Sequence, residues 1–421
     1  MLRFTENIIG QNTLGCNLRC KYCYESHAKK TLDYLDYKTF CQVFDNVLYY
    51  RCVLGDKNNR LIWHFHGGEV LMLPWEELKA EILYVEERKK YFPNIDWCIQ
   101  TNGTLVTDEI AKFFVEHNHN IGFSFDGFGD NDRMSAEGNK KLIDNLRLLH
   151  QKYGTRFSCL STFSRKNMRT WLSDMEKISD FCPSIGLNVL CDTSDEFIPN
   201  AEEQWTYWVE PVLKSLLTPN PIQERNVINV LERALQKNIY CSDFVEKTGC
   251  FDRICAFGSN MTSINPSLEM CGCDKHLDRG DFSEIDVLKK QSIYTRDFLG
   301  YQNAKRVINH IKNMYEIEKE TGCHTCPASD CCPGECQAYS YSRYGKVTLR
   351  KDLCEMYNKA YDFIEENWPI ILEHTSVSLF GVEDSPKYIT PYAHKKLKQM
   401  GYKLEIRNGW MRTIKINEGD K

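Results

Sequence analysis

Short apolar segments alternate with amphipathic helical segments over the first two hundred residues, and this alternation limits what the chain can fold into. Strands are predicted at residues 7–14, 61–65, 95–99, 121–125, 157–163 and 185–190. Helices between them are marked by apolar residues at helical spacing, as from Phe40 to Leu48, and by N-cap residues such as Asp36 and Thr107. Strands that alternate with helices pair in parallel through crossover connections, so the sequence predicts an α/β fold.

Polar residues and glycines follow several of these predicted strands. Gly67-Gly68-Glu69 comes after the second strand, Asn102-Gly103 after the third and Asp126-Gly127 after the fourth. In α/β barrels the C-terminal strand ends form the active site. Glycines let the backbone approach a ligand closely, and the Glu69 carboxylate can accept hydrogen bonds from an ammonium group. The structural alternative for each segment is a turn between a strand and a helix.

Composition and charge exclude several classes of protein. The chain has 421 residues, 42% hydrophobic and 26% charged residues and a net charge of −5, which is typical of a soluble globular protein of two or three units. It has no long basic run, so nucleic acid is not an expected partner. It has no signal peptide and no stretch near the roughly 20 apolar residues of a membrane span, so a cytoplasmic location is expected.

Twenty cysteines are distributed unevenly along the chain. In the reducing cytoplasm they are better explained as metal ligands than as disulfides. Three lie close together near the N-terminus, and ten lie between Cys250 and Cys354. The other seven lie mostly among apolar residues, where a cysteine acts as a small hydrophobic side chain; they are Cys41, Cys52, Cys98, Cys159, Cys182, Cys191 and Cys241.

The N-terminal group is Cys16-x3-Cys20-x2-Cys23, with Tyr22 directly before the last cysteine. Thiolates are soft ligands that suit iron–sulfur clusters, zinc or copper(I). Three thiolates leave one iron of a [4Fe–4S] cluster without a protein ligand. This stretch resembles the signature of the radical S-adenosylmethionine (SAM) enzymes, in which SAM binds the open iron. The alternatives are half of a zinc ribbon or a redox-active Cys-x-x-Cys pair.

The resemblance implies a partial (β/α)6, TIM-like barrel in which further residues bind SAM. Gly67-Gly68-Glu69 matches the family's glycine-glycine-glutamate segment, which holds the methionyl amine, although Val70 stands where proline is usual. Ser124 would lie near the SAM carboxylate and ribose, Tyr22 against the adenine, and His66 near the cofactor. His66 has an equally plausible structural role as a hydrogen-bonded histidine at the end of a strand.

The C-terminal cysteines resemble the SPASM domain, a cysteine-rich cap found after many radical SAM barrels. The resemblance rests on Cys323-x2-Cys326-x5-Cys332-x3-Cys336 and the distant Cys354, with Pro266 standing where the family pattern has glycine. It implies two auxiliary [4Fe–4S] clusters, and hence three clusters in the whole chain. The first would be held by Cys250, Cys255, Cys271 and Cys336, and the second by Cys323, Cys326, Cys332 and Cys354.

Three alternatives concern these ligands. Cys273 and Cys331 are close substitutes for Cys271 and Cys332. If Cys255 is not a ligand, the first auxiliary cluster would have an open iron that can take a substrate thiol. All-thiolate sites also suit zinc, which would make the chain a zinc-stabilised binding or scaffold protein instead of an enzyme.

Two groups of relatives differ in their chemistry. Anaerobic sulfatase maturases oxidise a cysteine or serine of a sulfatase to formylglycine, and an aspartate base follows the cysteine that matches Cys271. Gly272 stands at that position here, and the first aspartate is Asp274. The other group modifies ribosomally made peptides by forming thioether or carbon–carbon crosslinks. The sequence favours the second group, with Asp274 and Asp126 as candidate bases.

The complete prediction is a radical SAM oxidoreductase that modifies a peptide or protein substrate and receives electrons from a low-potential donor of the flavodoxin or ferredoxin type. The barrel is expected at residues 1–200, a helical bridge at 201–245, the SPASM domain at 246–358 and a C-terminal tail at 359–421. In the tail, residues 404–410 predict a hairpin with an Asn-Gly turn. Its strands could cap the barrel or pair with an extended peptide.

Overall fold

A computed structural model describes the chain in several stretches, and all structural statements concern these. They are residues 7–23, 25, 34–49, 60–190, 196–239, 261–271, 273, 291–292, 312, 315–329, 331–334, 336, 340, 351–378, 389–407 and 410–416.

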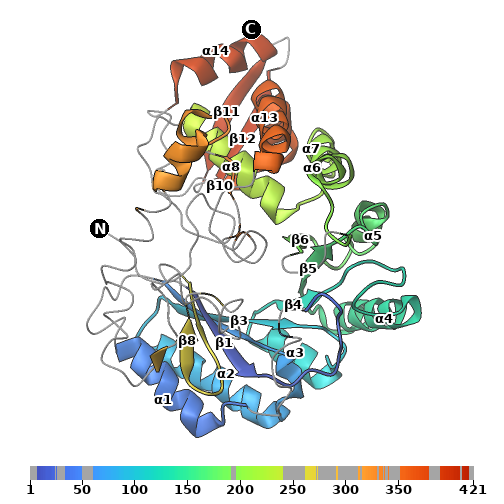
Figure 1. Ribbon diagram of the computed structural model, residues 1–421, viewed down its shortest axis with the longest axis vertical. Helices are drawn as coiled ribbons and strands as arrows, with labels where there is room; N and C mark the ends of the chain where they lie inside the picture. Colours follow the sequence, from blue (N-terminus) through green and yellow to red (C-terminus); the bar gives the residue numbers. More distant parts are fainter. Residues whose placement is uncertain are drawn as a thin grey trace.

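A parallel sheet is the centre of the fold (Figure 1). Its first six strands are β1 (Asn7–Thr13), β2 (Leu61–Gly67), β3 (Ile95–Thr101), β4 (Ile121–Ser124), β5 (Phe157–Phe163) and β6 (Ser184–Val189). They lie side by side in chain order and pair in parallel. The α/β prediction is confirmed, and β5 has the predicted bounds. Among the strands that the structure describes, β6 is the last on its side, and the barrel is open there.

Five helices follow the first five strands, and capping interactions explain where several of them begin. They are α1 (Tyr37–Leu48), α2 (Trp75–Lys89), α3 (Asp108–Glu116), α4 (Ala136–Tyr153) and α5 (Trp171–Glu176). Asp36 accepts a hydrogen bond from the Thr39 amide at the start of α1, and Thr107 accepts one from the Ile110 amide at the start of α3. Both predicted N-caps are therefore confirmed.

The two faces of the sheet differ in character. Alternate residues of β2 and β5 are buried, and the buried set faces the helices. Phe40 and Phe44 of α1 pack on Trp63 of β2 with ring centroids 5.2 and 5.6 Å apart. The opposite face, which is the inside of the partial barrel, has polar residues such as His64, Gln100 and Ser124 at half-buried positions. A polar interior suits a binding site better than a packed core.

The sheet extends beyond the six predicted strands. β7 (Met261–Ile264) pairs in parallel with β1, and β8 (Glu269–Cys271) and β9 (Gln291–Ser292) follow it with antiparallel pairing. The start of the cysteine-rich region is therefore continuous with the barrel sheet. Sequence periodicity did not identify β7, because its partner β1 lies about 250 residues earlier in the chain.

A helical region connects the barrel to the C-terminal part (Figure 1). It comprises α6 (Ala201–Gln204), the π-helical turn η4 (Trp205–Val209), α7 (Glu210–Ser215) and α8 (Arg225–Ile239). The break between α7 and α8 contains Pro219 and Pro221, since proline cannot continue a helix. Within the described stretches, no helix is both long and apolar enough to cross a membrane.

The C-terminal part contains one long helix and a small sheet. α13 (Cys354–His374) contacts α8 and packs on the sheet of β10 (Val377–Ser378), β12 (Trp410–Lys415) and β11 (Tyr402–Arg407), which α14 (Pro391–Met400) also contacts. β11 and β12 form the predicted antiparallel hairpin, whereas its Asn-Gly turn lies outside the described residues. α13 spans 21 residues and begins at a predicted cluster ligand, Cys354.

Candidate functional site

The loop from Gly15 to Cys23 lies at the C-terminal end of β1 and is attached to the rest of the barrel by backbone hydrogen bonds. The amide of Gly68 donates to the carbonyl of Thr13 at 2.8 Å, and the amide of Glu69 donates to the carbonyl of Gly15 at 2.7 Å. On the other side, the Lys21 amide donates to the Asp132 carbonyl at 2.9 Å. The cysteine-containing loop is thus fixed to the ends of two other strands.

Gly67 and Gly68 make this attachment possible because neither position has room for a side chain. Gly67 has φ +140°, and a Cβ there would lie 2.1 Å from the Thr13 carbonyl oxygen. A Cβ on Gly68 would lie 2.3 Å from the carbonyl oxygen of Gly15. The backbone at these glycines does approach another segment closely, and that segment is the cysteine loop; the approach to a ligand stays a prediction.

The carboxylate of Glu69 has partners within the protein. It accepts hydrogen bonds from the Thr101 hydroxyl at 2.5 Å, the Asn102 amide at 2.5 Å and the Leu71 amide at 3.0 Å. Burial raises the pKa of Glu69 above its ordinary value, and these hydrogen bonds oppose the rise. Because both oxygens accept donors, the backbone of Gly67-Gly68-Glu69 is a better candidate than the carboxylate for contacting an ammonium group.

A second set of hydrogen bonds joins the cysteine loop to the end of β3. The Asn102 side-chain amide donates to Asn17 Oδ1 at 2.7 Å, and Asn17 donates to the Thr104 hydroxyl at 2.9 Å. The Thr104 amide donates in turn to Asn102 Oδ1 at 3.0 Å. Asn102 therefore does more than cap a turn, since it holds the residue that follows Cys16.

A buried ion pair lies beneath the other end of the loop. The Tyr22 hydroxyl donates to Asp126 Oδ2, and Arg133 Nε donates to the same oxygen at 3.1 Å. The Thr162 amide donates to Asp126 Oδ1 at 2.7 Å. The Arg133 guanidinium also lies over the Tyr22 ring, 5.7 Å from its centroid. Asp126 is only 2% exposed and has donors on both oxygens, so it is better placed to position Tyr22 and Arg133 than to act as the predicted base.

Sequence reasoning did not identify Arg133, Asn17 or Thr104, because their importance depends on partners far along the chain. The sequence did indicate Asp126, as the acidic residue at the end of a strand. It also indicated Ser124 at the end of β4, whose hydroxyl accepts a hydrogen bond from Gln100 Nε2 at 3.0 Å. His66 lies on the same inner face of the sheet, on β2.

The thiols of Cys16, Cys20 and Cys23 are half-buried and close enough to affect one another electrostatically. Burial raises the pKa of all three, that of Cys23 to about 11, and their mutual charges add to the rise at Cys20 and Cys23. Positive charge from Arg133 opposes the rise at Cys20. Ligand binding must therefore displace protons from these thiols.

Four cysteines of the C-terminal region are also brought together. Burial raises the pKa of Cys332 to about 12, and the nearby thiols of Cys354, Cys323 and Cys326 contribute to that rise. These are the four residues predicted for the second auxiliary cluster. Cys331 is fully buried in the hydrophobic core and its thiol donates to the Ala328 carbonyl, so Cys332 is the better ligand of the two.

Among the described residues, no three His, Cys, Asp or Glu side chains converge on a position for a single metal ion. An iron–sulfur cluster places each thiolate on a different iron, so its ligands lie further apart than those of one ion. Soft, all-sulfur sets of three and four thiols therefore fit clusters of this kind.

The ligands predicted for the first auxiliary cluster are described only in part. Cys250, Cys255 and the candidate base Asp274 lie outside the described residues, and only the backbone of Cys271 is described. Cys336 packs with Tyr22 and Phe197 against Leu190 and Ile198. One predicted ligand of that cluster therefore lies beside the N-terminal cysteine loop.

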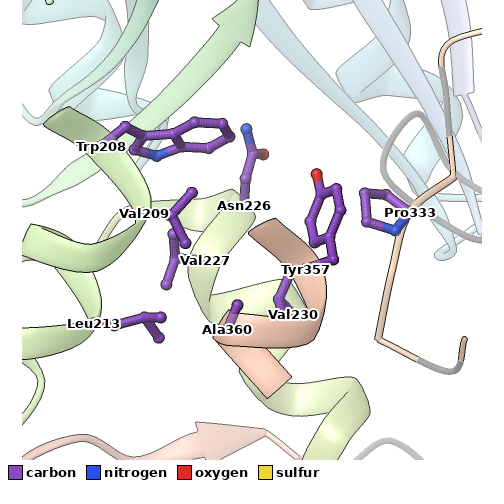
Figure 2. A pocket seen from close by; sticks show the side chains of 9 residues that line it. All are labelled: Trp208, Val209, Leu213, Asn226, Val227, Val230, Pro333, Tyr357 and Ala360. Atoms are coloured by element: carbon purple, nitrogen blue, oxygen red, sulfur yellow. The ribbon is translucent and has the colours of Figure 1, made fainter. Parts of the chain in front are cut away.

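An apolar pocket borders the four-cysteine group (Figure 2). It lies between η4, α7, α8 and α13, and it is lined by Trp208, Val209, Leu213, Asn226, Val227, Val230, Pro333, Tyr357 and Ala360. Pro333 directly follows Cys332, and Tyr357 lies about one helical turn after Cys354. One side of the pocket is thus formed by residues that lie close in sequence to two of these four cysteines.

Residues 13–169 match the radical SAM superfamily. The matched segment includes both the cysteine loop and the strand ends that hold it. The match agrees with the resemblance of the Cys16–Cys23 motif to the radical SAM signature.

Several proteins resemble the chain over most of its length. A cysteine-type anaerobic sulfatase-maturating enzyme of Clostridium novyi is 23% identical over 84% of this chain and 92% of its own. The structure of anSMEcpe with bound AdoMet and Cp18Cys peptide has a TM-score of 0.66 and 18% identity, covering 87% of this chain and 97% of that one. The structure of Streptococcus suis SuiB bound to precursor peptide SuiA has a TM-score of 0.58 and 12% identity. The match covers 84% of this chain and 76% of that one.

Proposed function

We propose that this radical SAM enzyme oxidatively modifies a side chain of a ribosomally made peptide, forming a crosslink through a thioether or carbon–carbon bond, in the cytoplasm. The observation that supports this most strongly is the attachment of the Cys16–Cys23 loop to the C-terminal strand ends, through Gly68, Glu69 and Asp132. This attachment presents three thiols to a polar barrel interior.

Within this proposal, Cys16, Cys20 and Cys23 lose their protons and hold a [4Fe–4S] cluster. When bound there together with SAM, the cluster supplies reductive cleavage of SAM and removal of a hydrogen atom from the substrate. The backbone of Gly67-Gly68-Glu69 orients the methionyl amine, and Ser124 and His66 lie on the inner face next to SAM. Asp126 orients Tyr22 through the hydrogen bond to its hydroxyl, so that the ring faces the adenine.

The C-terminal cysteines have a role in electron transfer in this proposal. Cys323, Cys326, Cys332 and Cys354 hold one auxiliary cluster, and Cys250, Cys255, Cys271 and Cys336 hold another. Forming a crosslink removes one electron and one proton beyond the abstracted hydrogen atom. An auxiliary cluster held by these thiols would provide a site for that electron, Asp274 would accept the proton, and a flavodoxin-type or ferredoxin-type protein would be the electron donor.

Two observations bear on the choice of substrate. The relatives named above include enzymes that mature a sulfatase and an enzyme crystallised with a precursor peptide. Formylglycine formation on a cysteine or serine of a protein is therefore the second candidate, supported by the similarity to the Clostridium novyi enzyme. Gly272 occupies the position of the maturases' aspartate base, which favours peptide crosslinking.

Anaerobic reconstitution tests the proposal. About twelve irons per chain are expected for three clusters, and SAM with dithionite should yield 5′-deoxyadenosine. Peptides encoded near this gene should then lose two hydrogen atoms by mass spectrometry and resist fragmentation between the linked residues. Zinc in place of iron, with no deoxyadenosine, would instead identify a zinc-stabilised binding protein. An aldehyde that reacts with hydrazine reagents would identify formylglycine formation.

A further inference from the structure

Arg225 is an exposed arginine at the first position of α8, beside the open edge of the barrel. A Cβ on Gly186 would lie only 2.0 Å from one guanidinium nitrogen of Arg225 and 2.6 Å from its Cζ. The guanidinium therefore lies directly against the bare backbone of β6. Any larger residue at position 186 would displace it.

The face of β6 that Arg225 covers is the inner face of the barrel. Gly186 pairs with Leu160 of β5, and Leu160 pairs with Ser124 of β4, so all three lie on one face of the sheet. Ile185 and Leu187, which flank Gly186, are buried in the hydrophobic core on the other face. Arg225 thus shares the face that contains the predicted SAM-binding residue Ser124.

The positive charge of Arg225 also acts across this interior. Burial raises the pKa of the Cys98 thiol of β3 to about 12, and Arg225 is one of two arginines whose charge opposes that rise. Asn188 lies two residues beyond Gly186, about 7 Å along the strand, and pairs with Thr162. The Thr162 amide donates to Asp126, so β6 is connected through β5 to the Tyr22–Asp126–Arg133 group.

No carboxylate of the described part of the chain pairs with Arg225. The charge of Arg225 acts on the neighbouring Glu224, but both oxygens of that carboxylate already accept hydrogen bonds, from four donors in all. They are the amides of Leu187, Asn226 and Val227 and the Trp208 indole, at 2.9 to 3.2 Å. Glu224 also pairs with Ile185 as an added edge of the sheet. These bonds fix the backbone that presents Arg225, so the cation is held in place at low entropic cost.

We infer that Arg225, held against Gly186 at the open edge of the barrel, is a subsite for a carboxylate of the peptide substrate. The inference rests on the proposed function, since it assumes that a peptide enters the barrel beside β6. An acidic side chain and a free C-terminus present the same chemistry. A planar guanidinium binds a carboxylate through two parallel hydrogen bonds, which gives direction as well as affinity.

Peptide display tests this inference without turnover. Random dodecapeptides with a tethered C-terminus are selected on the reconstituted protein with SAM but without reductant, and a second library presents free C-termini. The wild-type protein should enrich Asp and Glu, or free C-termini, roughly tenfold, in line with a charge-assisted hydrogen bond. Arg225→Gln should abolish the enrichment, and Arg225→Lys should retain part of it.

Two further variants serve as matched tests. Gly186→Ala keeps the charge and displaces the guanidinium, so it should reduce the enrichment without abolishing it. Arg156→Gln removes a distant exposed arginine, bound to the Asn118 carbonyl at 2.7 Å, and should change nothing. The inference is overturned if the peptides selected on wild-type protein and on Arg225→Gln contain equal fractions of Asp and Glu. Absence of enrichment in both selections would also overturn it.

Weaker SAM binding by Arg225→Gln would also overturn it, since the guanidinium would then serve the cofactor's carboxylate. The expected SAM affinity of the variant is within about twofold of wild type. Formation of 5′-deoxyadenosine separates this inference from the proposed function. If wild-type protein makes deoxyadenosine but its selected peptides show no acidic preference, only the subsite is wrong.

Discussion

At the scale of single residues, buried polar groups in this protein are paired with specific partners, and two of these pairs predict measurable effects. Asp126 and Arg133 form a buried ion pair with Tyr22 and Thr162. Asn12 and Glu81 form a buried pair behind the cysteine loop. The Asp126–Arg133 pair is ionic, whereas the Asn12–Glu81 pair is best explained with a protonated, neutral Glu81.

The Asn12–Glu81 pair predicts a pH-dependent stability. Asn12 Nδ2 donates to Glu81 Oε2 at 2.7 Å, while Asn12 Oδ1 and Glu81 Oε1 have no partner unless Glu81 is protonated and donates to Asn12. Burial raises the pKa of Glu81 well above its ordinary value of 4.5. The folded state therefore keeps a proton that the unfolded state loses, and the free energy of unfolding falls as pH rises above about 4.5.

Glu81→Gln should remove this contribution. Urea unfolding at pH 5 and pH 8 measures it, and the wild-type protein should lose more stability between the two values than the variant does. Glu76→Gln, at an exposed position of the same helix, is the control. Equal losses in the wild-type protein and in Glu81→Gln would show that Glu81 is ionised in the folded state.

Removing one partner of the Asp126–Arg133 pair should destabilise the protein strongly. Arg133→Gln leaves the Asp126 carboxylate buried without its cation, which typically costs 3–5 kcal/mol. Asp126→Asn combined with Arg133→Gln removes both charges and should recover part of the loss. A double-mutant cycle by urea unfolding measures the coupling, and additive losses would contradict the pairing.

At the scale of elements, the sequence predicted the strands of the barrel well because their signals are local. All six predicted strands occur, and β5 has the predicted bounds, since alternation and flanking turn residues fix such limits. β7 and the loop attachments could not be predicted, because Gly68 meets Gly15 and Met261 meets Asn7 only through the tertiary fold. Cys332 and Cys331 are adjacent, and only burial distinguishes them.

The loop attachment predicts that Gly68→Ala impairs cluster binding more than folding. The new methyl group would meet the backbone of Gly15, which cannot move without displacing the loop before Cys16. Iron content after reconstitution should fall by roughly four per chain, one cluster. Gly129→Ala, where a Cβ meets nothing within 4 Å, is the matched control and should reconstitute normally. Unchanged iron in Gly68→Ala would mean that the loop adapts.

At the scale of the whole molecule, the C-terminal cysteines join segments that are distant in sequence. Cys323, Cys326 and Cys332 lie near Cys354, which begins α13, and α13 packs on α8 and on the C-terminal sheet. A cluster at these thiols would connect the cysteine-rich segment to the long helix. Its loss should therefore act first on α13 and the segments that carry these cysteines, and less on the barrel strands, whose pairing does not involve them.

Two adjacent cysteines test this separation. Cys332→Ser should remove roughly four irons per chain and lower the protease resistance of residues near α13, while SAM cleavage at the N-terminal cluster continues. Cys331→Ser should keep its iron but lose about 1–3 kcal/mol of stability, because a hydroxyl replaces a fully buried thiol. Iron analysis, limited proteolysis and deoxyadenosine formation distinguish the two. If Cys331→Ser loses the iron instead, Cys331 is the ligand and the chain near residue 331 must rotate to present it.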